Sequence, residues 1–339
     1  MIINNEMKVS VCIVAYNEEN NLPQLLDCVR NQDFPHERME VVLIDGGSDD
    51  RTKEIMNNFK NEDNGFYNVQ VLDNPKRKQA CGWNVAILNY TGDVIIRVDA
   101  HARLTENFVK KNMEVQERGE YVCGGIRPNV IDNSTLWKET LLLAEQSMFG
   151  SSVASFKRSN KKEYVKTLFH GAYRREVFEK AGFFDEQLGR TEDNEMHYRI
   201  RKAGYNIFYS PEIVSYQCIR STLKGMIKQK FGNGLWISLT LKVAPRCLSL
   251  YHFVPMCFVL GIIFTTVLVF AGFPLLAEIM WTAYWVTSIL MSFHAVKGVE
   301  KNMYHIFLPI LFFILHISYG VGSVVGLFKL PFWKYEKQD

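Results

Sequence analysis

The sequence has little net charge and none of the compositional extremes that mark unusual classes of protein. Its 39 Lys and Arg residues nearly balance 36 Asp and Glu residues, which leaves a formal net charge of +3 over 339 residues. So small an excess gives no electrostatic basis for binding nucleic acid. A hydrophobic content of 47% and a charged content of 22% exclude a disordered, collagen-like or disulfide-rich chain. The length predicts about two domains.

Cysteine is sparse, and its spacing lacks the patterns of metal sites. The seven cysteines include no CxxC pair and no Cys/His cluster, so we expect reduced thiols in a cytosolic setting. The features of a signal peptide are also missing. Residues 1–8 contain Asn4, Asn5, Glu6 and Lys8, and the apolar run that follows is short, so no signal peptide is expected.

Charge is scarce above all in the C-terminal part of the chain, although the mean hydropathy of the whole chain is a moderate −0.07. Residues 251–328 contain only four charged side chains: Glu278, Lys297, Glu300 and Lys301. The apolar stretches 252–270, 275–293 and 306–327 each approach the roughly 20 residues that a membrane span needs. We expect three transmembrane helices, the first two joined as a hairpin at 272–274.

The positions of Lys and Arg predict how these stretches are oriented. Five basic residues precede the first stretch and place the N-terminal part in the cytoplasm: Lys224, Lys228, Lys230, Lys242 and Arg246. The turn at 271–275 has no Lys or Arg and is expected outside. Three spans then put the tail outside, although it carries Lys329, Lys334 and Lys337. Either the tail is an exception to the charge rule, or one stretch is re-entrant or interfacial.

The basic and aromatic segment 219–250 has two interpretations. It forms amphipathic helices on the inner leaflet, or it is a plain juxtamembrane linker. The chain as a whole is therefore predicted to contain a cytoplasmic domain (1–218), a juxtamembrane segment (219–250), a transmembrane region (251–328) and a short basic tail (329–339).

The N-terminal part alternates between short apolar runs and helical patterns. Strands are expected at 9–15, 41–44, 69–72, 94–98 and 121–123, and helices at 51–59, 80–89 and from a cap at Thr105 to 117. This order is typical of a parallel sheet covered on both faces. Ligands bind beyond the carboxyl ends of such strands, where Asn17, Glu18, Asp45 and Asp99 lie. The chain has no GxxxxGK[ST] or GxGxxG motif, which disfavours phosphate-loop and Rossmann proteins.

Five segments in this order resemble the family 2 glycosyltransferases with a GT-A fold. They are VCIVAYNEE at 11–19, VLIDGGSDDRT at 42–52, GDVIIRVD at 92–99, GAYRREVFEKAGFFD at 171–185 and EDNEMHYRIRKAGY at 192–205. The resemblance covers about residues 8–215. It implies an α/β nucleotide-sugar-binding domain with a mixed, mainly parallel sheet, followed here by a helical membrane region. The three-span tail and RVDAHA look like membrane-bound exopolysaccharide enzymes of the succinoglycan type.

The resemblance implies that the first two loops bind the nucleotide. Asp45 matches the carboxylate that accepts a hydrogen bond from the base, and the imide N–H of uracil suits it. Tyr16, Asn17 and Glu18 follow the first strand, and the tyrosine ring is placed to pack on the base. The alternative for Asp45 is an N-cap of the following helix. Ser48 is better placed for that role, as is Asp49.

The segment that follows the third strand matches a part of the family that faces the donor. Arg77 and Lys78 are cationic and suited to neutralise phosphate, and Asn84 lies on the next helix. The alternative is an ordinary solvated surface.

The resemblance places a metal-binding DxD motif at Asp99. Here the sequence reads Asp99-Ala100-His101, so a histidine replaces the second carboxylate. The motif implies a divalent metal, Mn²⁺ or Mg²⁺, that stabilises the departing diphosphate, and imidazole suits Mn²⁺ better. The alternative is that His101 hydrogen-bonds a phosphate and Asp99 is the only protein carboxylate at the metal.

The acidic pair Glu192 and Asp193 matches the family's catalytic segment. Asp193 is implied as the general base that takes the proton of an acceptor hydroxyl, while Glu192 orients the acceptor or tunes Asp193. A single displacement inverts the anomeric configuration. The alternative is that the pair complements the dipole of the helix that begins there.

Four residues are candidates for the acceptor side. His170, Gly171 and Arg174 lie in the stretch that resembles the acceptor wall, although a structural role for His170 is equally consistent. Gln229 begins a segment that falls where processive relatives carry QxxRW, but this chain lacks the Arg-Trp pair. With three spans there is also little room for a polymer channel, so we expect one sugar to be added per acceptor.

These patterns predict a membrane-anchored enzyme of exopolysaccharide or capsule assembly. It is expected to transfer a sugar from a nucleotide donor to a lipid-linked glycan. We expect it in the cell membrane, with its catalytic domain in the cytoplasm. The expected partners are the donor, a polyprenyl-diphosphate-linked acceptor and the bilayer, with no nucleic acid. The sequence indicates no oligomeric state. Alternatives are a polyprenyl-phosphate sugar synthase and a non-catalytic membrane protein that binds sugar nucleotides.

Overall fold

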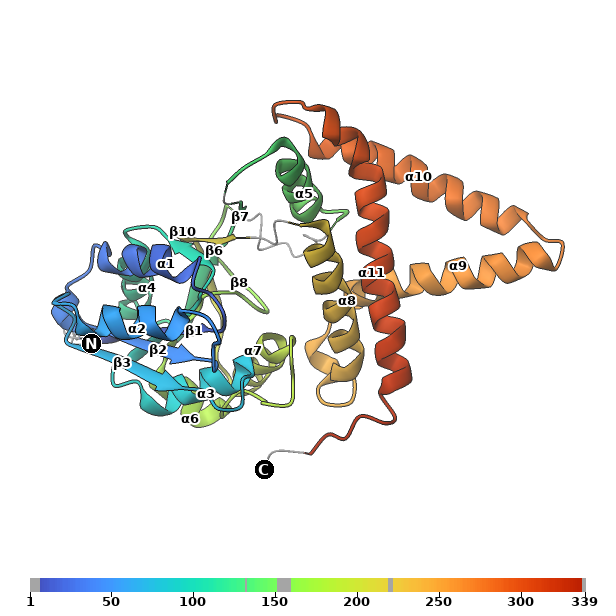
Figure 1. Ribbon diagram of the computed structural model, residues 1–339. Helices are drawn as coiled ribbons and strands as arrows, with labels where there is room; N and C mark the ends of the chain where they lie inside the picture. The colour runs from blue at the N-terminus through green and yellow to red at the C-terminus, as the bar shows by residue number, and fades with distance from the viewer. Residues whose placement is uncertain (1–6, 132, 151–159, 219–221, 337–339) are drawn as a thin grey trace. The chain divides into compact units, whose positions relative to one another are not determined.

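The computed structural model describes residues 7–131, 133–150, 160–218 and 222–336 (Figure 1). The chain divides into two compact units. The first comprises Met1–Pro128 and Phe156–Cys218, and the second comprises Asn129–Ser155 and Ile219–Asp339. The sequence predicts that 129–155 belong to the N-terminal domain, whereas in the structure this segment belongs to the second unit.

The first unit is built on a mixed sheet in the order β3-β2-β1-β4-β9-β6-β10-β5, with β8 beside β10. Its strands are β1 (Val9–Ala15), β2 (Met39–Asp45), β3 (Asn68–Asp73), β4 (Val94–Asp99), β5 (Ala102–Leu104), β6 (Val122–Ile126), β8 (Glu163–Tyr164), β9 (Ala172–Arg174) and β10 (Phe208–Cys218). β1 lies between β2 and β4 in parallel register, with Val11 opposite both Val41 and Ile96. β9 is antiparallel to β4 and β6. The predicted mixed, mainly parallel sheet is confirmed.

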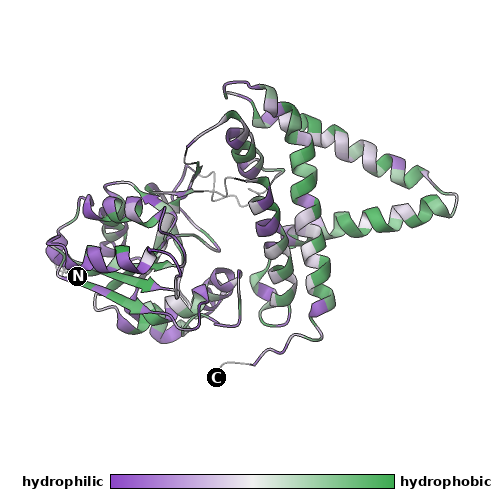
Figure 2. Cartoon of the chain, in the orientation of Figure 1, coloured by the Kyte–Doolittle hydropathy of each residue, from purple (hydrophilic) through white to green (hydrophobic). Residues whose placement is uncertain are grey.

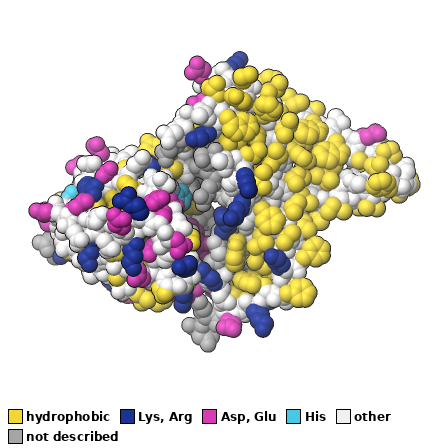
Figure 3. Space-filling view, viewed as in Figure 1, with side chains coloured by type: hydrophobic (Ala, Val, Ile, Leu, Met, Phe, Trp, Pro, Cys, Tyr) yellow, Lys and Arg dark blue, Asp and Glu magenta, His cyan; other side chains and the backbone are white. Residues whose placement is uncertain are grey.

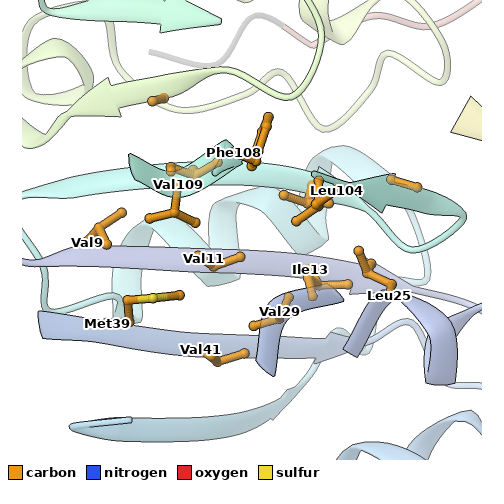
Figure 4. Packing of buried hydrophobic residues seen from close by; sticks show 14 of the residues in the cluster. Val9, Val11, Ile13, Leu25, Val29, Met39, Val41, Leu104, Phe108 and Val109 are labelled. Carbon is orange, nitrogen blue, oxygen red and sulfur yellow. The ribbon is translucent and has the colours of Figure 1, made fainter. Parts of the chain in front are cut away.

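Helices cover both faces of this sheet because its apolar strands present side chains to either side. They are α1 (Leu22–Arg30), α2 (Thr52–Asn61), α3 (Gln79–Asn89), α4 (Phe108–Glu117), α6 (Arg175–Ala181) and α7 (Glu192–Lys202), with a 3₁₀ turn at His36–Arg38. Helices α1, α2 and α4 contribute to one buried cluster, seen in Figure 4, and helices α3, α6 and α7 contribute to the other. In Figure 2 the strands are hydrophobic and the outer faces of the helices are hydrophilic.

The segment after Asp99 differs from the sequence prediction. Thr105 does not cap the next helix, because α4 begins at Phe108 after Asn107. Residues 102–104 instead form β5, which pairs antiparallel with β10. The Thr105 hydroxyl donates to the backbone oxygen of Val214. This strand turns the chain back at the carboxyl end of β4, next to Asp99.

The second unit consists of helices, apart from the short strand β7 (Asn129–Val130). Its helices are α5 (Leu136–Gln146), α8 (Leu223–Thr240), α9 (Val254–Phe270), α10 (Leu275–Ala295) and α11 (Leu308–Lys329), with 3₁₀ turns at Pro245–Cys247, Leu250–Phe253 and Met303–Phe307. Within the described residues, three helical stretches are long and apolar enough to cross a membrane: Leu250–Phe270, Leu275–Ala295 and Met303–Lys329. Hydrophobic side chains cover much of the visible surface of this unit in Figure 3.

Helix α8 packs closely along α11. The sequence predicts the segment 219–250 as amphipathic helices on the inner leaflet or as a plain linker, and neither interpretation includes this packing. A Cβ atom on Gly322 would lie 2.1 Å from the backbone oxygen of Phe231, and one on Gly326 would lie 2.5 Å from that of Leu235. Glycine therefore permits the two backbones to touch. Because 231 lies beside 322 and 235 beside 326, the two helices run in the same direction.

Candidate functional site

The loops after β1 and β2 are joined by side chains predicted to bind the nucleotide. Asn17, which has a φ of 54°, donates its backbone N–H to Ser48 Oγ at 3.0 Å, and its side-chain oxygen accepts from the N–H of Asp49 at 2.9 Å. Asp45 is buried and accepts from the N–H of Ser48 at 3.2 Å. The Tyr16 side chain beside them is exposed. Asp45 thus shapes a turn and is not an N-cap, since α2 begins only at Thr52.

The β1 loop also approaches the loop that follows β4. Glu18 Oε1 lies 3.4 Å from His101 Nδ1, and the backbone N–H of Glu18 donates to Thr52 Oγ1 at 2.8 Å. The His101 Nε2 atom lies 3.1 Å from the amide nitrogen of Gln217 on β10. The structure therefore brings together Glu18 and His101, which are 83 positions apart in the sequence, at the carboxyl edge of the sheet.

Asp99 at the end of β4 is surrounded by polar groups that the sequence did not connect with it. Its Oδ2 lies 3.4 Å from His170 Nε2 and 3.6 Å from Arg127 Nη1, and its Oδ1 accepts from Gln79 at 3.2 Å. His170 has a φ of 48°, and its Nδ1 lies 2.9 Å from Ser215 Oγ. Burial by itself would raise the pKa of Asp99, but the neighbouring His170 and the cationic Arg127 hold it well below its usual range.

A metal site complete in protein ligands is not present among the described residues, since no group of three or more His, Cys, Asp or Glu side chains is placed to hold an ion. Asp99 and His101 supply one carboxylate and one imidazole. This small donor set fits an ion that shares its coordination with substrate phosphates, as Mg²⁺ commonly does, and does not fit an ion held by protein alone.

Arg97 is the residue that connects the acidic pair to the sheet, and the sequence did not predict it as a site residue. Its Nη1 donates to Asp193 Oδ1 at 2.7 Å, and its side chain is only 8% exposed. The guanidinium lies between two rings, 4.3 Å from the centre of Trp83 and 4.4 Å from that of Phe184. The available signal was a single arginine within the otherwise apolar run VIIRVD.

Glu192 and Asp193 begin α7 in contrasting surroundings. The Glu192 side chain is buried, and its Oε2 has no hydrogen-bond partner among the residues that the structure describes. Burial, together with the adjacent Asp193 carboxylate, raises the pKa of Glu192 to about 8. Glu192 is therefore mostly protonated at neutral pH, while Asp193 is paired with Arg97. The two neighbouring acids are chemically distinct.

The predicted donor-side residues are only partly directed outward. Arg77, with a φ of 57°, is exposed and lies 4.0 Å from Asp49. Lys78 Nζ donates to the backbone oxygen of Glu186 at 3.1 Å. Asn84 is buried, and its amide makes two hydrogen bonds to the backbone of Phe184, at 2.8 and 2.9 Å. The Asn84 amide is thus engaged within the protein.

The structure separates the predicted acceptor-side residues. The backbone oxygen of Gly171 accepts from the N–H of Arg97, so Gly171 and His170 lie toward the carboxyl end of β4. Arg174 pairs with Val94 at the opposite end of β4 and donates to Gln116. Gln229 lies on α8 in the second unit. His170 and Gly171 are therefore near Asp99, whereas Arg174 is at the far edge of the sheet.

Comparisons with known proteins agree on the kind of protein. A dolichyl N-acetyl-α-D-glucosaminyl phosphate 3-β-D-2,3-diacetamido-2,3-dideoxy-β-D-glucuronosyltransferase of Methanococcus voltae is 27% identical over 329 residues, which cover 95% of this chain and 97% of that protein. The succinoglycan biosynthesis protein ExoA of Rhizobium meliloti (strain 1021) is 30% identical over 226 residues, or 66% of this chain and 67% of that protein.

A solved structure shows the same fold at low sequence identity. The mannosyltransferase PcManGT from Pyrobaculum calidifontis, in complex with GDP-Man and Mn²⁺, has a TM-score of 0.59 and 16% identity, covering 95% of this chain and 88% of that one. The family model described as glycosyl transferase family 2 matches residues 10–182, which include β1, β2, β4 and Asp99. The chain is a glycosyltransferase and belongs to glycosyl transferase family 2.

Proposed function

We propose that this glycosyltransferase transfers one sugar, with inversion, from a nucleotide donor to a lipid-linked glycan at a membrane. The observation that carries the proposal is the Arg97–Asp193 bond of 2.7 Å. Arg97 and Asp99 are two positions apart on β4, so their side chains lie on the same face of the sheet, roughly 7 Å apart along the strand. One strand thus positions both the carboxylate expected at the diphosphate and the expected base.

In the proposed reaction Asp193 accepts the proton of the acceptor hydroxyl. As the oxygen of that hydroxyl forms a bond to the anomeric carbon, the bond between this carbon and the diphosphate breaks on the opposite side. The structure records Asp193 Oδ1 as the acceptor from Arg97, which leaves Oδ2 for the hydroxyl. The bond from Arg97 fixes the direction of the Asp193 carboxylate. Neutral Glu192 next to it is suited to donate a hydrogen bond to the acceptor.

The donor is proposed to lie across the loops after β1, β2 and β4, with Asp45 accepting from the base and a uridine diphosphate as the preferred carrier. Asp99 and His101 would hold a divalent ion together with the diphosphate, and that ion would supply charge neutralisation for the leaving group. Glu18, Arg77 and Lys78 belong to the same edge of the proposed site. The PcManGT complex, which contains GDP-Man and Mn²⁺, supports this class of donor and ion.

The acceptor is proposed to be a polyprenyl-diphosphate-linked glycan of exopolysaccharide or capsule assembly, with the first unit in the cytoplasm. Three helices are apolar enough to cross a membrane, and the relative from Methanococcus voltae is named for a dolichyl-phosphate-linked substrate. A membrane anchor raises the effective concentration of such an acceptor near the site. The absence of the Arg-Trp pair after Gln229 supports the addition of a single sugar.

The test measures UDP release by the full-length protein in vesicles that contain polyprenyl-diphosphate-linked acceptors, across a panel of UDP-sugars. Asp193→Asn is expected to lower kcat by about 10²–10⁴-fold, because general bases contribute that much. Asp33→Asn, at an exposed ion pair with Lys110, is the matched control and should retain full activity. A loss of less than roughly tenfold in Asp193→Asn would favour a phosphate acceptor, which needs no base. Full activity in Asp99→Ala would contradict the assignment of a metal to Asp99.

A further inference from the structure

A groove lies on the second unit between α8 and α11. Its apolar walls are formed by Ile227 and Phe231 on α8 and by Ile317 and Val321 on α11, and its volume is about 380 Å³. Lys224 and Lys228 on α8 and Ser318 on α11 complete the lining, which is almost entirely apolar, so the lysines line it with their aliphatic stems and hold their ammonium groups at its rim. The α8 residues recur at positions i, i+3, i+4 and i+7, so they form one face of that helix.

The two lysines of this groove lack acidic partners. Neither α8 nor α11 contains an Asp or Glu residue. In the part of the chain that the structure describes, no carboxylate forms an ion pair with Lys224 or Lys228. Lys230 on the same helix is different, because its Nζ bonds Glu145 Oε1 at 2.7 Å on the buried side of α8. Within the described residues, the positive charge of Lys224 and Lys228 at the rim of the groove is therefore not neutralised, whereas that of Lys230 is.

The lysines also lie beside the middle of α11. Because α8 and α11 run in the same direction with Phe231 beside Gly322, Lys228 is level with the stretch 318–321, within a helix that begins at Leu308 and ends at Lys329. Exposed charges beside a membrane-spanning helix are expected near its ends, since a lysine at the bilayer centre is strongly disfavoured. An anionic group bound between Lys224 and Lys228 would neutralise their charge.

We propose that this groove binds the lipid part of the acceptor, with the isoprenoid chain against Ile227, Phe231, Ile317 and Val321 and its diphosphate between Lys224 and Lys228. The inference rests on the proposed function, because that function requires a lipid-linked acceptor. An isoprenoid diphosphate matches both features of the groove. Its compact anion suits the two lysines, and its branched hydrocarbon suits the apolar walls. Ammonium groups bind phosphate oxygens by charge-assisted hydrogen bonds, and the apolar walls exclude water from the chain.

The test uses the full-length protein in nanodiscs of neutral phosphatidylcholine and a benzophenone-labelled farnesyl diphosphate, without any sugar donor. The probe is expected to crosslink to α8 and α11 around Ile227, Ile317 and Val321. Lys224→Met combined with Lys228→Met should weaken binding by at least roughly tenfold, since two charge-assisted bonds are lost. Lys297→Met combined with Lys301→Met removes the same charge from the same unit and should change binding less than twofold. Val321→Trp, which fills the groove, should also abolish labelling.

Crosslinks outside α8 and α11 would overturn the proposal, and so would each of three binding results. The first is that farnesol, which has no diphosphate, binds as tightly as farnesyl diphosphate. The second is that phosphatidylglycerol displaces the probe as well as unlabelled farnesyl diphosphate does. The third is that both double variants lose the same amount of binding, which would indicate a general attraction to anionic lipid. Because binding is measured without turnover, the two proposals fail separately. Sugar transfer to a lipid acceptor with crosslinks elsewhere refutes only the groove, and labelling of the groove in a chain that transfers no sugar refutes only the function.

Discussion

Replacing Arg97 by methionine tests whether the Arg97–Asp193 pair acts as a unit. Methionine keeps an apolar side chain between Trp83 and Phe184 but removes the charge that lies 2.7 Å from Asp193. Removal of one partner of a buried pair costs about 3–5 kcal/mol. The Asp193 side chain is 26% exposed, so water can solvate the unpaired carboxylate and lower this cost. We therefore expect the free energy of unfolding to fall by about 2–3 kcal/mol in Arg97→Met.

The same variant is expected to lower kcat by at least roughly tenfold with little change in the KM for the donor, because Asp193 loses its fixed direction. Asp193→Asn leaves the buried Arg97 charge without its anionic partner, so it should be destabilising as well as inactive. A double-mutant cycle on thermal unfolding and on kcat measures the coupling. The double variant should be no less active than Asp193→Asn, since residues that act as a unit are not additive. Independent effects on kcat, or a coupling below about 0.5 kcal/mol, would refute this account.

Three further predictions concern stability. Because burial raises the pKa of Glu192 to about 8 from an ordinary 4.5, the folded protein holds this proton more tightly than the unfolded chain, and its stability should fall as the pH rises from about 4.5 to about 8. Glu192→Gln should abolish that fall. At pH 8 its free energy of unfolding should exceed that of the wild type by roughly 5 kcal/mol at most. Unfolding experiments at pH 5 and pH 8 measure both effects. Asn84→Ala should lower the melting temperature, at a cost of about 1–3 kcal/mol, with an unchanged donor KM in steady-state kinetics. Gly322→Val should separate α8 from α11 and cost at least about 1–3 kcal/mol, measured by thermal unfolding and limited proteolysis in detergent.

Each of these predictions has a contrary result. A wild-type stability that rises between pH 5 and pH 8 would show that Glu192 is ionised in the folded protein. A large increase in donor KM in Asn84→Ala would show that its amide contacts the donor and not only Phe184. Normal stability of Gly322→Val would mean that α8 does not approach α11 as closely as the structure indicates.

The sheet and the edge that carries the candidate site were predictable because both follow from local patterns. Apolar β-branched runs that end in polar residues define β1, β2 and β4, and the rule for parallel sheets places their carboxyl ends together. The positions of Asp45 and Asp99 at one edge could therefore be inferred without a structure. The three apolar helices were equally accessible, because their length and composition determine the assignment.

The partners of these residues were not predictable, since they come from distant parts of the chain. Asp99 meets His170 and Arg127 only because β9 is inserted antiparallel between β4 and β6, which no local pattern reveals. The charge on Arg97 was visible in a buried strand, but its partner Asp193 lies 96 positions away. Likewise the glycines of α11 were visible, but the helix that packs against them was not.

The segment 129–155 belongs to the second unit but lies in the sequence between the two parts of the first, and this order has a consequence for synthesis of the chain. The buried side chains Leu141 and Ala144 of α5 pack with Leu311 and Phe312 of α11, which is synthesised much later than α5. During translation α5 is therefore exposed for as long as the rest of the chain takes to emerge, and transiently exposed apolar surface favours aggregation. A fragment that ends at residue 218 keeps α5 and permanently lacks α11. Soluble expression of the first unit should therefore require the removal of 129–155 together with 219–339.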